Sequence, residues 1–428
     1  MKNLGEIKDL NQRLHFFSAI NDSAKDAARF SVKDNICVKG FEARAGSKIL
    51  SGYVPPFDAT CVERMAKKGY NFIGKTVMDE FGFGSFGVNT DVQARNPFDE
   101  KRVAGGSSSG AAVATAVLKD HIAISESTGG SISNPASFCG VVGFTPTYGT
   151  VSRYGLIDYA NSLDKIGLMA RSSEEIRKAF DIIRGADRYD TTCTENGITD
   201  SKKKKLVVID QLMHGIDDGI LASFEALLAK LEGMGYKVER TSLDFIDKAI
   251  PAYYIISMAE ASTNLAKYTG YKYGRQLDAF TKKYNEFFTE AREVFGMEAK
   301  RRIVLGTFVR SASVKERYYT KALKVRALLA NKLSELMKDA FVISPTMPIM
   351  APKIDEAAEL PPLQAYAMDS LTIPPNLTGL PHVSFPYDYL KGMPVGAQLV
   401  TTHFNDYALL DFVGKWEKSF DYKFKYNL

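Results

Sequence analysis

The chain has few of the residues from which metal centres and disulfide frameworks are built. Its 428 residues include five histidines, one tryptophan and four cysteines. The cysteines are widely scattered and form no CxxC pair, at Cys37, Cys61, Cys139 and Cys193. This spacing argues against a disulfide framework or a zinc site and favours a reducing compartment. We therefore expect a cytoplasmic protein without a metal site.

Long apolar runs and a strong charge excess are also absent from the sequence. No segment approaches the length of a membrane span, and residues 1–6 lack the apolar core of a signal peptide, which fits the same expectation. A net charge of +5 permits contact with a polyanion without requiring it. The chain is 45% hydrophobic and 25% charged, as expected of a globular protein that can bury a large core.

Short apolar strands alternate with helices and glycine-rich turns, which is typical of an α/β fold. Apolar spacing predicts helices around residues 5–17, 61–68, 111–118, 172–186 and 219–236, and largely helical structure through 251–335. Strands are predicted within residues 36–50 and at 71–74, 121–125, 206–209, 341–344, 381–386 and 395–402. We expect one α/β domain with a mixed central sheet, helices covering both faces, and the site at the loop ends.

A polar stretch at residues 187–205 is the candidate hinge or surface loop. It ends in four consecutive lysines at 202–205, just before an apolar strand. Because no aromatic residues interleave with the lysines, a solvated loop that shields the strand end is favoured over contact with nucleic acid.

Two glycine- and serine-rich segments carry the candidate chemistry. Residues 105–110 read GGSSSG, and residues 127–132 read STGGSI. A serine is a poor nucleophile until a base takes its proton, and glycine lets backbone N–H groups crowd a reacting atom. The segments therefore indicate a serine hydrolase or acyl-transfer site.

Ser131 is the candidate nucleophile because it follows two glycines. The neighbouring amides can converge on one point and stabilise a tetrahedral oxyanion. This predicted oxyanion hole consists of Thr128, Gly129, Gly130 and Ser131. On the motif alone, a plain glycine-rich turn explains the segment equally well.

Lys33 is the candidate base. A lysine accepts a proton only when neutral, which requires burial or a cationic neighbour. Apolar side chains flank it, at Phe30, Val32 and Ile36. A surface ion pair with Asp34 is the plainer alternative. A serine of the first segment could relay the proton between Lys33 and Ser131, since a hydroxyl both donates and accepts.

A second interpretation of the first segment is a nucleophile elbow, since residues 106–110 match G-x-S-x-G. That motif needs a strand directly before it, whereas residues 96–102 form a polar stretch that contains a proline. His382 and His403 could complete a Ser-His triad, although five scattered histidines make this match easy by chance. The segment is not a phosphate loop, because no Gly-Lys-Ser/Thr follows.

Taken together, the lysine segment VKDN and the two glycine-serine segments resemble the amidase signature family. This resemblance implies one amidase-signature domain with a Lys–cis-Ser–Ser triad. Lys33 would be the base, Ser107 the bridging serine that follows a cis peptide bond, and Ser131 the nucleophile that forms the acyl-enzyme.

More specific motifs resemble the A subunits (GatA) of the glutamyl/aspartyl-tRNA amidotransferases, at residues 74–81, 139–156, 259–262, 301–308 and 376–381. The resemblance implies a domain over residues 1–428, with a catalytic core at about 30–185 and a glutamine-binding helical portion at about 250–380. It implies glutamine hydrolysis, with ammonia passed to a B subunit. There ATP and Mg²⁺ drive amidation of Glu-tRNA(Gln) or Asp-tRNA(Asn), and this chain itself needs no cofactor.

The same resemblance implies residues that bind glutamine. An arginine would bind the α-carboxylate and an aspartate the α-amine, by position Arg302 (or Arg301) and Asp369, with Tyr253 lining the pocket. A planar guanidinium matches a carboxylate in a bidentate way, and an aspartate pairs with an ammonium group. A solvated helix face is the plain alternative for the two arginines.

The chain departs from the commoner bacterial pattern, which has Asp and Arg where Ser127 and Ser133 stand here. Residues 82–84 and 126–128 instead resemble the archaeal form. The expected partners are GatB- and GatC-like subunits in a heterotrimer, with aminoacyl-tRNA bound mainly through the B subunit. A stand-alone amidase acting on another small amide, or a binding-only subunit, are the alternatives.

Overall fold

A mixed eleven-stranded sheet runs through the part of the chain that the computed structural model describes, residues 2–25, 28–195, 203–278 and 282–419. Its strand order is β1-β3-β2-β4-β6-β5-β10-β11-β9-β7-β8. The strands are β1 Phe17–Ile20, β2 Arg29–Lys33, β3 Asn71–Thr76, β4 His121–Ser127, β5 Val142–Thr145, β6 Lys165–Ala170, β7 Lys205–Ile209, β8 Lys237–Thr241, β9 Ala340–Pro345, β10 His382–Leu390 and β11 Met393–Val400. Parallel trios, β3-β2-β4 and β9-β7-β8, flank an antiparallel centre.

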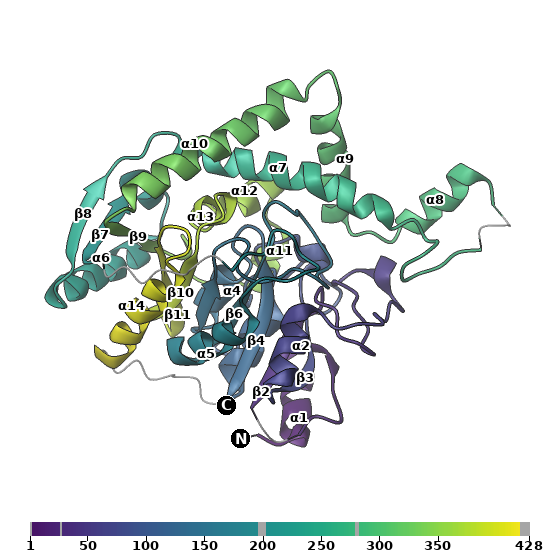
Figure 1. Cartoon of the computed structure of the whole chain (residues 1–428), viewed down its shortest axis with the longest axis horizontal. Coiled ribbons are helices and arrows are strands. Elements are labelled where there is room, and N and C mark those ends of the chain that lie inside the picture. Colours follow the sequence, from purple (N-terminus) through teal and green to yellow (C-terminus); the bar gives the residue numbers. More distant parts are fainter. Residues whose placement is uncertain (1, 26–27, 196–202, 279–281, 420–428) are drawn as a thin grey trace.

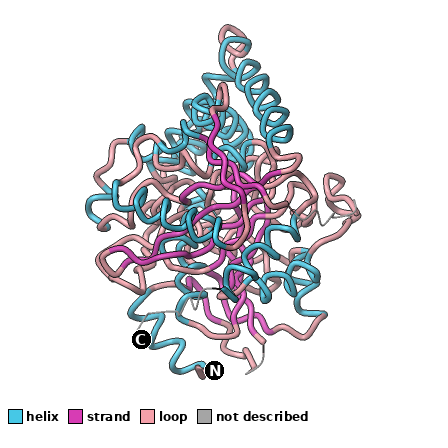
Figure 2. Tube along the Cα trace, turned by 90° about the vertical axis from the view of Figure 1, so that its left-hand side faces the viewer, coloured by secondary structure: helices cyan, strands magenta, loops and turns pink. Residues whose placement is uncertain are grey.

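Helices cover both faces of this sheet, as predicted (Figures 1 and 2). The α-helices are α1 Leu4–Leu14, α2 Thr60–Lys67, α3 Ser109–Val117, α4 Ser133–Phe138, α5 Ser173–Ile183, α6 Asp218–Gly233, α7 Ala249–Asn264, α8 Tyr284–Arg292, α9 Met297–Arg310, α10 Lys321–Leu336, α11 Ile354–Ala358, α12 Pro362–Ala367, α13 Ile373–Leu377 and α14 Asp406–Ser419. On β4, Ile122 and Ile124 pack into a core with α2, α5, α6 and α14, whereas Ala123 packs with α3 and α4. Successive strand side chains point to opposite faces, so one strand serves both cores.

A third core forms where α7, α9 and α10 pack together, along the upper edge of the molecule in Figure 1. It joins these helices to the loop that carries Phe81 and Phe83. Residues of this helical layer therefore reach the carboxyl-end loops of the sheet, where the site lies.

Most of the predicted elements are confirmed, and the misses have physical causes. The predicted strand within residues 36–50 is wrong. Apart from one bridge at Ile36 and a short 3₁₀-helix at Lys48–Leu50, this is a loop whose amides at Arg44 and Gly46 donate to the Asp34 carboxylate. The predicted elements do not include strand β2, whose five residues, RFSVK, are all buried although three of them are polar. Residues 196–202 of the predicted polar loop lie outside the described residues.

The predicted solvated lysine run is wrong at Lys203. This side chain is buried, and its Nζ donates to the Thr401 hydroxyl at 3.0 Å. Lys205 begins β7 and pairs with Glu239 on β8 at 2.8 Å. The lysines thus fasten the sheet edge to neighbouring segments. The division into portions at about 30–185 and 250–380 stays a prediction.

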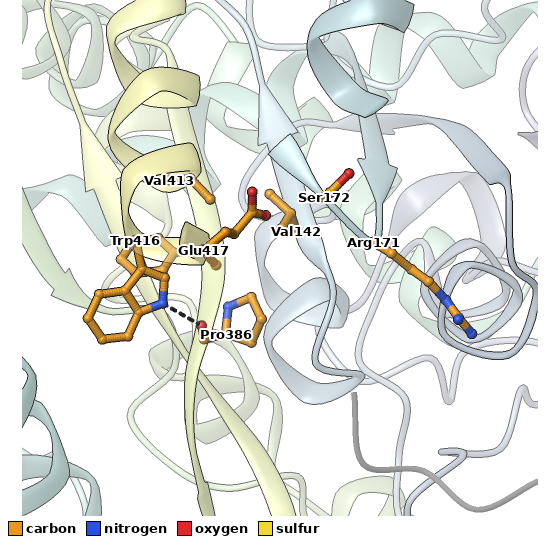
Figure 3. A pocket seen from close by; sticks show the side chains of 8 residues that line it. Val142, Arg171, Ser172, Pro386, Val413, Trp416 and Glu417 are labelled. Atoms are coloured by element: carbon orange, nitrogen blue, oxygen red, sulfur yellow. Dashed lines mark hydrogen bonds between the residues drawn. The ribbon is translucent and has the colours of Figure 1, made fainter. Parts of the chain in front are cut away.

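Helix α14 is fastened to the start of α5 by a half-buried carboxylate. Glu417 accepts hydrogen bonds from the Ser173 amide at 3.0 Å and hydroxyl at 2.6 Å, and burial raises the pKa of Glu417. A pocket opens beside this contact, where Trp416 Nε1 donates to the Pro386 carbonyl at 3.3 Å (Figure 3). Because Glu417 is committed to the helix start, the pocket belongs to the packing of the two helices.

Candidate active site

The sheet topology brings the predicted base and nucleophile to one edge. Lys33 is the last residue of β2, and Ser131 lies in the turn between β4 and α4. The two strands are parallel neighbours, with Val32 opposite Ile124, so their carboxyl ends meet. Ser107 comes from the loop that leads into α3. Three segments far apart in the sequence therefore converge at this edge.

Lys33 is fully buried and contacts the predicted bridging serine. Its Nζ donates to Ser107 Oγ at 2.7 Å. The peptide bond between Gly106 and Ser107 is cis, as the amidase resemblance implies. The geometry of base and bridging hydroxyl thus matches the predicted relay.

The surroundings of Lys33 differ from the expectation of an apolar or surface setting. Its Nζ also donates to Glu126 Oε2 at 2.8 Å and to the Glu126 carbonyl at 3.0 Å. The surface pair with Asp34 is wrong, because Asp34 faces Lys75 instead, with Nζ and Oδ1 3.7 Å apart. Sequence reasoning missed Glu126. The only available signal was a lone carboxylate at the end of the strand before the second glycine-serine segment.

Ser131 lines a narrow pocket together with Arg302 and Asp369, the candidates for binding the α-carboxylate and the α-amine of glutamine. The residues around it are Gly82, Gly84, Ser85, Gly106, Gly129, Gly130, Ser131, Tyr253, Tyr254, Arg302 and Asp369. Ser131 is 7% exposed, and no hydrogen bond within the described residues joins its Oγ to Ser107 Oγ. Catalytic hydrogen bonds often tighten only when substrate is bound.

The predicted oxyanion loop presents free donors. Within the described chain, the backbone N–H groups of Gly129, Gly130 and Ser131 have no acceptor. An added Cβ at Gly129 would lie 2.4 Å from the Tyr253 hydroxyl, so only glycine fits there. Thr372 Oγ1 donates to the Gly129 carbonyl at 2.9 Å and fixes the loop.

The start of α3 is held without a side-chain cap. Ser108 occupies the N-cap position, but its side chain makes no capping hydrogen bond. Its Oγ instead donates to the Glu126 carbonyl at 3.3 Å. The first glycine-serine segment is therefore tied to the end of β4, beside the second segment.

Arg302 and Asp369 lie in the same pocket with distinct supports. Arg302 is buried, and its Nε donates to Glu298 Oε1 at 2.8 Å. Asp369 Oδ2 accepts from Ser85 Oγ at 2.7 Å and from the Tyr254 hydroxyl at 3.0 Å. Burial raises the pKa of Asp369 to about 6, although the two hydroxyl groups and the nearby guanidinium favour its charged form.

Neither Ser85 nor Tyr254 is expected from the sequence. Ser85 lies in a glycine-rich loop and Tyr254 beside the predicted Tyr253, and only the folded chain shows that they meet one carboxylate. Arg301 is not part of the pocket; it is 35% exposed and pairs with Glu298 from the outer side. The geometry therefore favours Arg302 over Arg301.

The elbow alternative for the first segment is wrong. Among the described residues, no strand leads directly into Gly106, which lies in a loop. His382 is buried against Asn376 and the Leu380 carbonyl, and neither it nor His403 lines the Ser131 pocket. No group of three or more potential ligands among the described His, Cys, Asp and Glu residues could hold a metal ion.

Comparisons with known proteins agree with this geometry. The Amidase family model matches residues 29–410. The chain therefore belongs to the Amidase family. The 6-aminohexanoate cyclic dimer hydrolase, with a TM-score of 0.81 but 21% identity over 97% of this chain and 92% of that one, shares the fold alone.

More similar relatives narrow the family. The glutamyl-tRNA(Gln) amidotransferase A subunit from Symbiobacterium thermophilum is 44% identical over 91% of this chain and 82% of that protein. Its counterpart from Halobacterium salinarum is 41% identical over 91% and 95%. The crystal structure of the Thermotoga maritima counterpart has a TM-score of 0.82 and 34% identity, covering 97% and 90%. The chain therefore belongs to the family of glutamyl-tRNA(Gln) amidotransferase A subunits.

Two further expectations concern the archaeal form of the subunit and membrane-spanning helices. The archaeal form stays a prediction, because the Symbiobacterium thermophilum and Halobacterium salinarum proteins are about equally similar to this chain. Among the helices of the described residues, none is both long and apolar enough to cross a bilayer.

Proposed function

We propose that this chain hydrolyses glutamine through a Ser131 acyl-enzyme and supplies the ammonia for tRNA-dependent amidation. One observation carries this proposal. Ser131 shares a narrow pocket with a buried guanidinium, Arg302, and a buried carboxylate, Asp369. A pair of opposite charges beside a serine fits an amino acid whose side chain bears the amide.

The two charges orient the substrate by its ends. Arg302 binds the α-carboxylate of glutamine, and Asp369 binds the α-ammonium group. Ser85 and Tyr254 hold the Asp369 carboxylate in place. Holding both ends presents the side-chain amide to Ser131, which converts the reaction to an effectively unimolecular one.

The reaction then proceeds by two acyl transfers. Ser131 Oγ attacks the amide carbon while its proton passes through Ser107 Oγ to the neutral amine of Lys33. The amides of the predicted oxyanion loop stabilise the negative oxygen. The C–N bond breaks as the proton returns to the nitrogen, ammonia leaves, and a glutamyl ester remains on Ser131. Water attacks this ester by the same route and releases glutamate.

The partner proteins complete the amidation. GatB- and GatC-like subunits form a heterotrimer with this chain, in the cytoplasm. The B subunit uses ATP and Mg²⁺ to activate Glu-tRNA(Gln) or Asp-tRNA(Asn), which gives the complex ligase activity. The names of the relatives support a tRNA-linked role.

The proposal is tested by glutamate release from glutamine, measured for the chain alone and with B and C subunits. We expect release that Ser131→Ala abolishes, and ammonia that appears in amidated tRNA only when the partners are present. A stand-alone amidase would hydrolyse another small amide with no partner, and a binding-only subunit would release no glutamate in either arm.

A further inference from the structure

A buried carboxylate stands directly behind the proposed base. Glu126 is 1% exposed, and its Oε2 accepts from Lys33 Nζ at 2.8 Å and from Asn35 Nδ2 at 3.2 Å. The following residue, Ser127, points elsewhere and donates to Asn376 Oδ1 at 3.3 Å. The residue pattern at this strand end therefore aims one carboxylate at the base.

Glu126 belongs to a chain of three buried side chains. Thr128 Oγ1 lies within hydrogen-bond distance of Glu126 Oε1 and, at 2.7 Å, of Asp164 Oδ1. A hydroxyl has one proton, so it can donate to only one of these two oxygens. The other carboxyl must carry a proton and donate to Thr128 in turn.

Asp164 is the protonated member. Its Oδ2 accepts from the backbone amides of Tyr159 and Ala160, both at 2.9 Å, which leaves Oδ1 to carry the proton. Burial, and then the charge of Glu126, raise the pKa of Asp164 well above its usual value. Glu126 then accepts the Thr128 hydroxyl on Oε1, while its Oε2 faces the Nζ atom of Lys33.

We propose that Glu126 is a positioning residue of this active site, which orients Lys33 on Ser107 and stabilises the ammonium that forms when Lys33 takes the serine proton. Asp164 and Thr128 hold it in the charged, correctly aimed state. The arrangement plays the part that the aspartate plays behind the histidine of a Ser-His-Asp triad. The inference rests on the proposed function, because it assigns a role within the same relay.

The carboxylate has a consequence for pH dependence. A buried amine beside a negative charge holds its proton more firmly than one without it. Replacing the Glu126 carboxylate by an amide of the same shape therefore makes Lys33 a weaker base, whose amine is unprotonated at lower pH. A merely structural contact would slow the reaction without moving its pH dependence.

The test measures the second-order rate of Ser131 labelling by phenylmethylsulfonyl fluoride against pH, on the full chain together with its B and C subunits. Labelling forms an Oγ–S bond, releases fluoride and passes the serine proton to the relay. It needs no glutamine. If the wild-type enzyme is labelled but does not hydrolyse glutamine, the proposed function fails while the role of Glu126 is still tested.

In Glu126→Gln we expect the rate at the plateau to fall about 100-fold and the pH of half-maximal labelling to fall by about one unit or more. Glu126→Asp keeps a buried charge but cannot place it at the same point, so we expect a slower rate and a smaller shift in the same direction. The Glu126→Asp variant keeps the test decisive if Glu126→Gln does not fold.

Ser127→Ala is the matched control, since it removes a neighbouring buried hydroxyl on the opposite side of the strand. It should leave both the plateau and the midpoint unchanged. The titratable carboxyl groups near Lys33 are Glu126, the protonated Asp164, and Asp79, whose pKa burial raises to about 7. Asp79 is present in every variant, so its titration cancels in the comparison.

The inference is overturned if Glu126→Gln or Glu126→Asp is labelled more slowly but with the wild-type pH of half-maximal labelling. It is also overturned if Glu126→Gln is labelled at the wild-type rate. A midpoint that moves to lower pH with a reduced plateau supports it.

Discussion

The Nζ atom of Lys33 lies 2.7 Å from the Oγ atom of Ser107, although 74 positions separate the two residues. Both groups are fully buried, so the contact is shielded from competing water. The hydroxyl is therefore placed to hand a proton to the amine, provided that the same hydroxyl can accept one from Ser131.

This contact predicts that the relay acts as a unit. Lys33→Ala and Ser107→Ala should each lower kcat for glutamine by about 10³-fold or more, and the double variant should be little worse than either one. Glutamate release under saturating glutamine measures the effect. Losses that simply multiply in the double variant would mean that the two residues act independently.

The pocket predicts a division of labour between two adjacent arginines. Arg302→Lys should lower kcat/KM for glutamine by about 100-fold, because an ammonium cannot bind a carboxylate in the bidentate way of a guanidinium. Arg301→Lys is the matched control, since Arg301 also pairs with Glu298 but lies outside the pocket. Equal losses in the two variants would contradict the proposed role of Arg302.

The pKa of Asp369 predicts an acid limb in substrate capture. Burial raises this pKa to about 6, so the carboxylate that binds the α-ammonium is charged above pH 6 and neutral below it. A profile of kcat/KM against pH should therefore fall as pH drops through about 6. Asp369→Asn should lower kcat/KM at neutral pH and remove this step; a step that survives in the variant belongs to another group.

Tyr253 lies so close to Gly129 that we expect only glycine to be tolerated at this position of the predicted oxyanion loop. Gly129→Ala would place a methyl group 2.4 Å from the Tyr253 hydroxyl, so either the loop or the ring must move. We expect kcat to fall about 100-fold, as when an oxyanion donor is lost. Gly233→Ala, with no atom within 4 Å of the added carbon, should keep wild-type activity. Similar activity in both alanine variants would argue against this tight packing.

The candidate nucleophile and base could be proposed from the sequence because their signals are local. Ser131 and Lys33 sit in short segments whose residue types already indicate the chemistry, and the resemblance to amidases supplied Ser107. Glu126 gave no such signal, since its partner Lys33 is 93 positions away. Ser85 meets Asp369 across 284 positions, a contact that only the folded sheet and its loops create.

The same reason limits prediction of the fold. The start of helix α5 is predictable, because the Ser172 side chain and Glu175 form a capping box that is readable in sequence. Strands β5 and β6 are buried on both faces, so they show no alternation between apolar and polar residues. Their place follows from the order of strands in the sheet, which local patterns do not encode.

The proposed reaction cleaves glutamine through an ester on Ser131. The most direct measurement is acid quenching of the enzyme during turnover, followed by mass spectrometry of the peptide that carries Ser131. We expect a glutamyl adduct on Ser131 that is absent in Ser131→Ala, together with loss of glutamate release. An adduct on another residue, or a Ser131→Ala enzyme that releases glutamate at the wild-type rate, would contradict it.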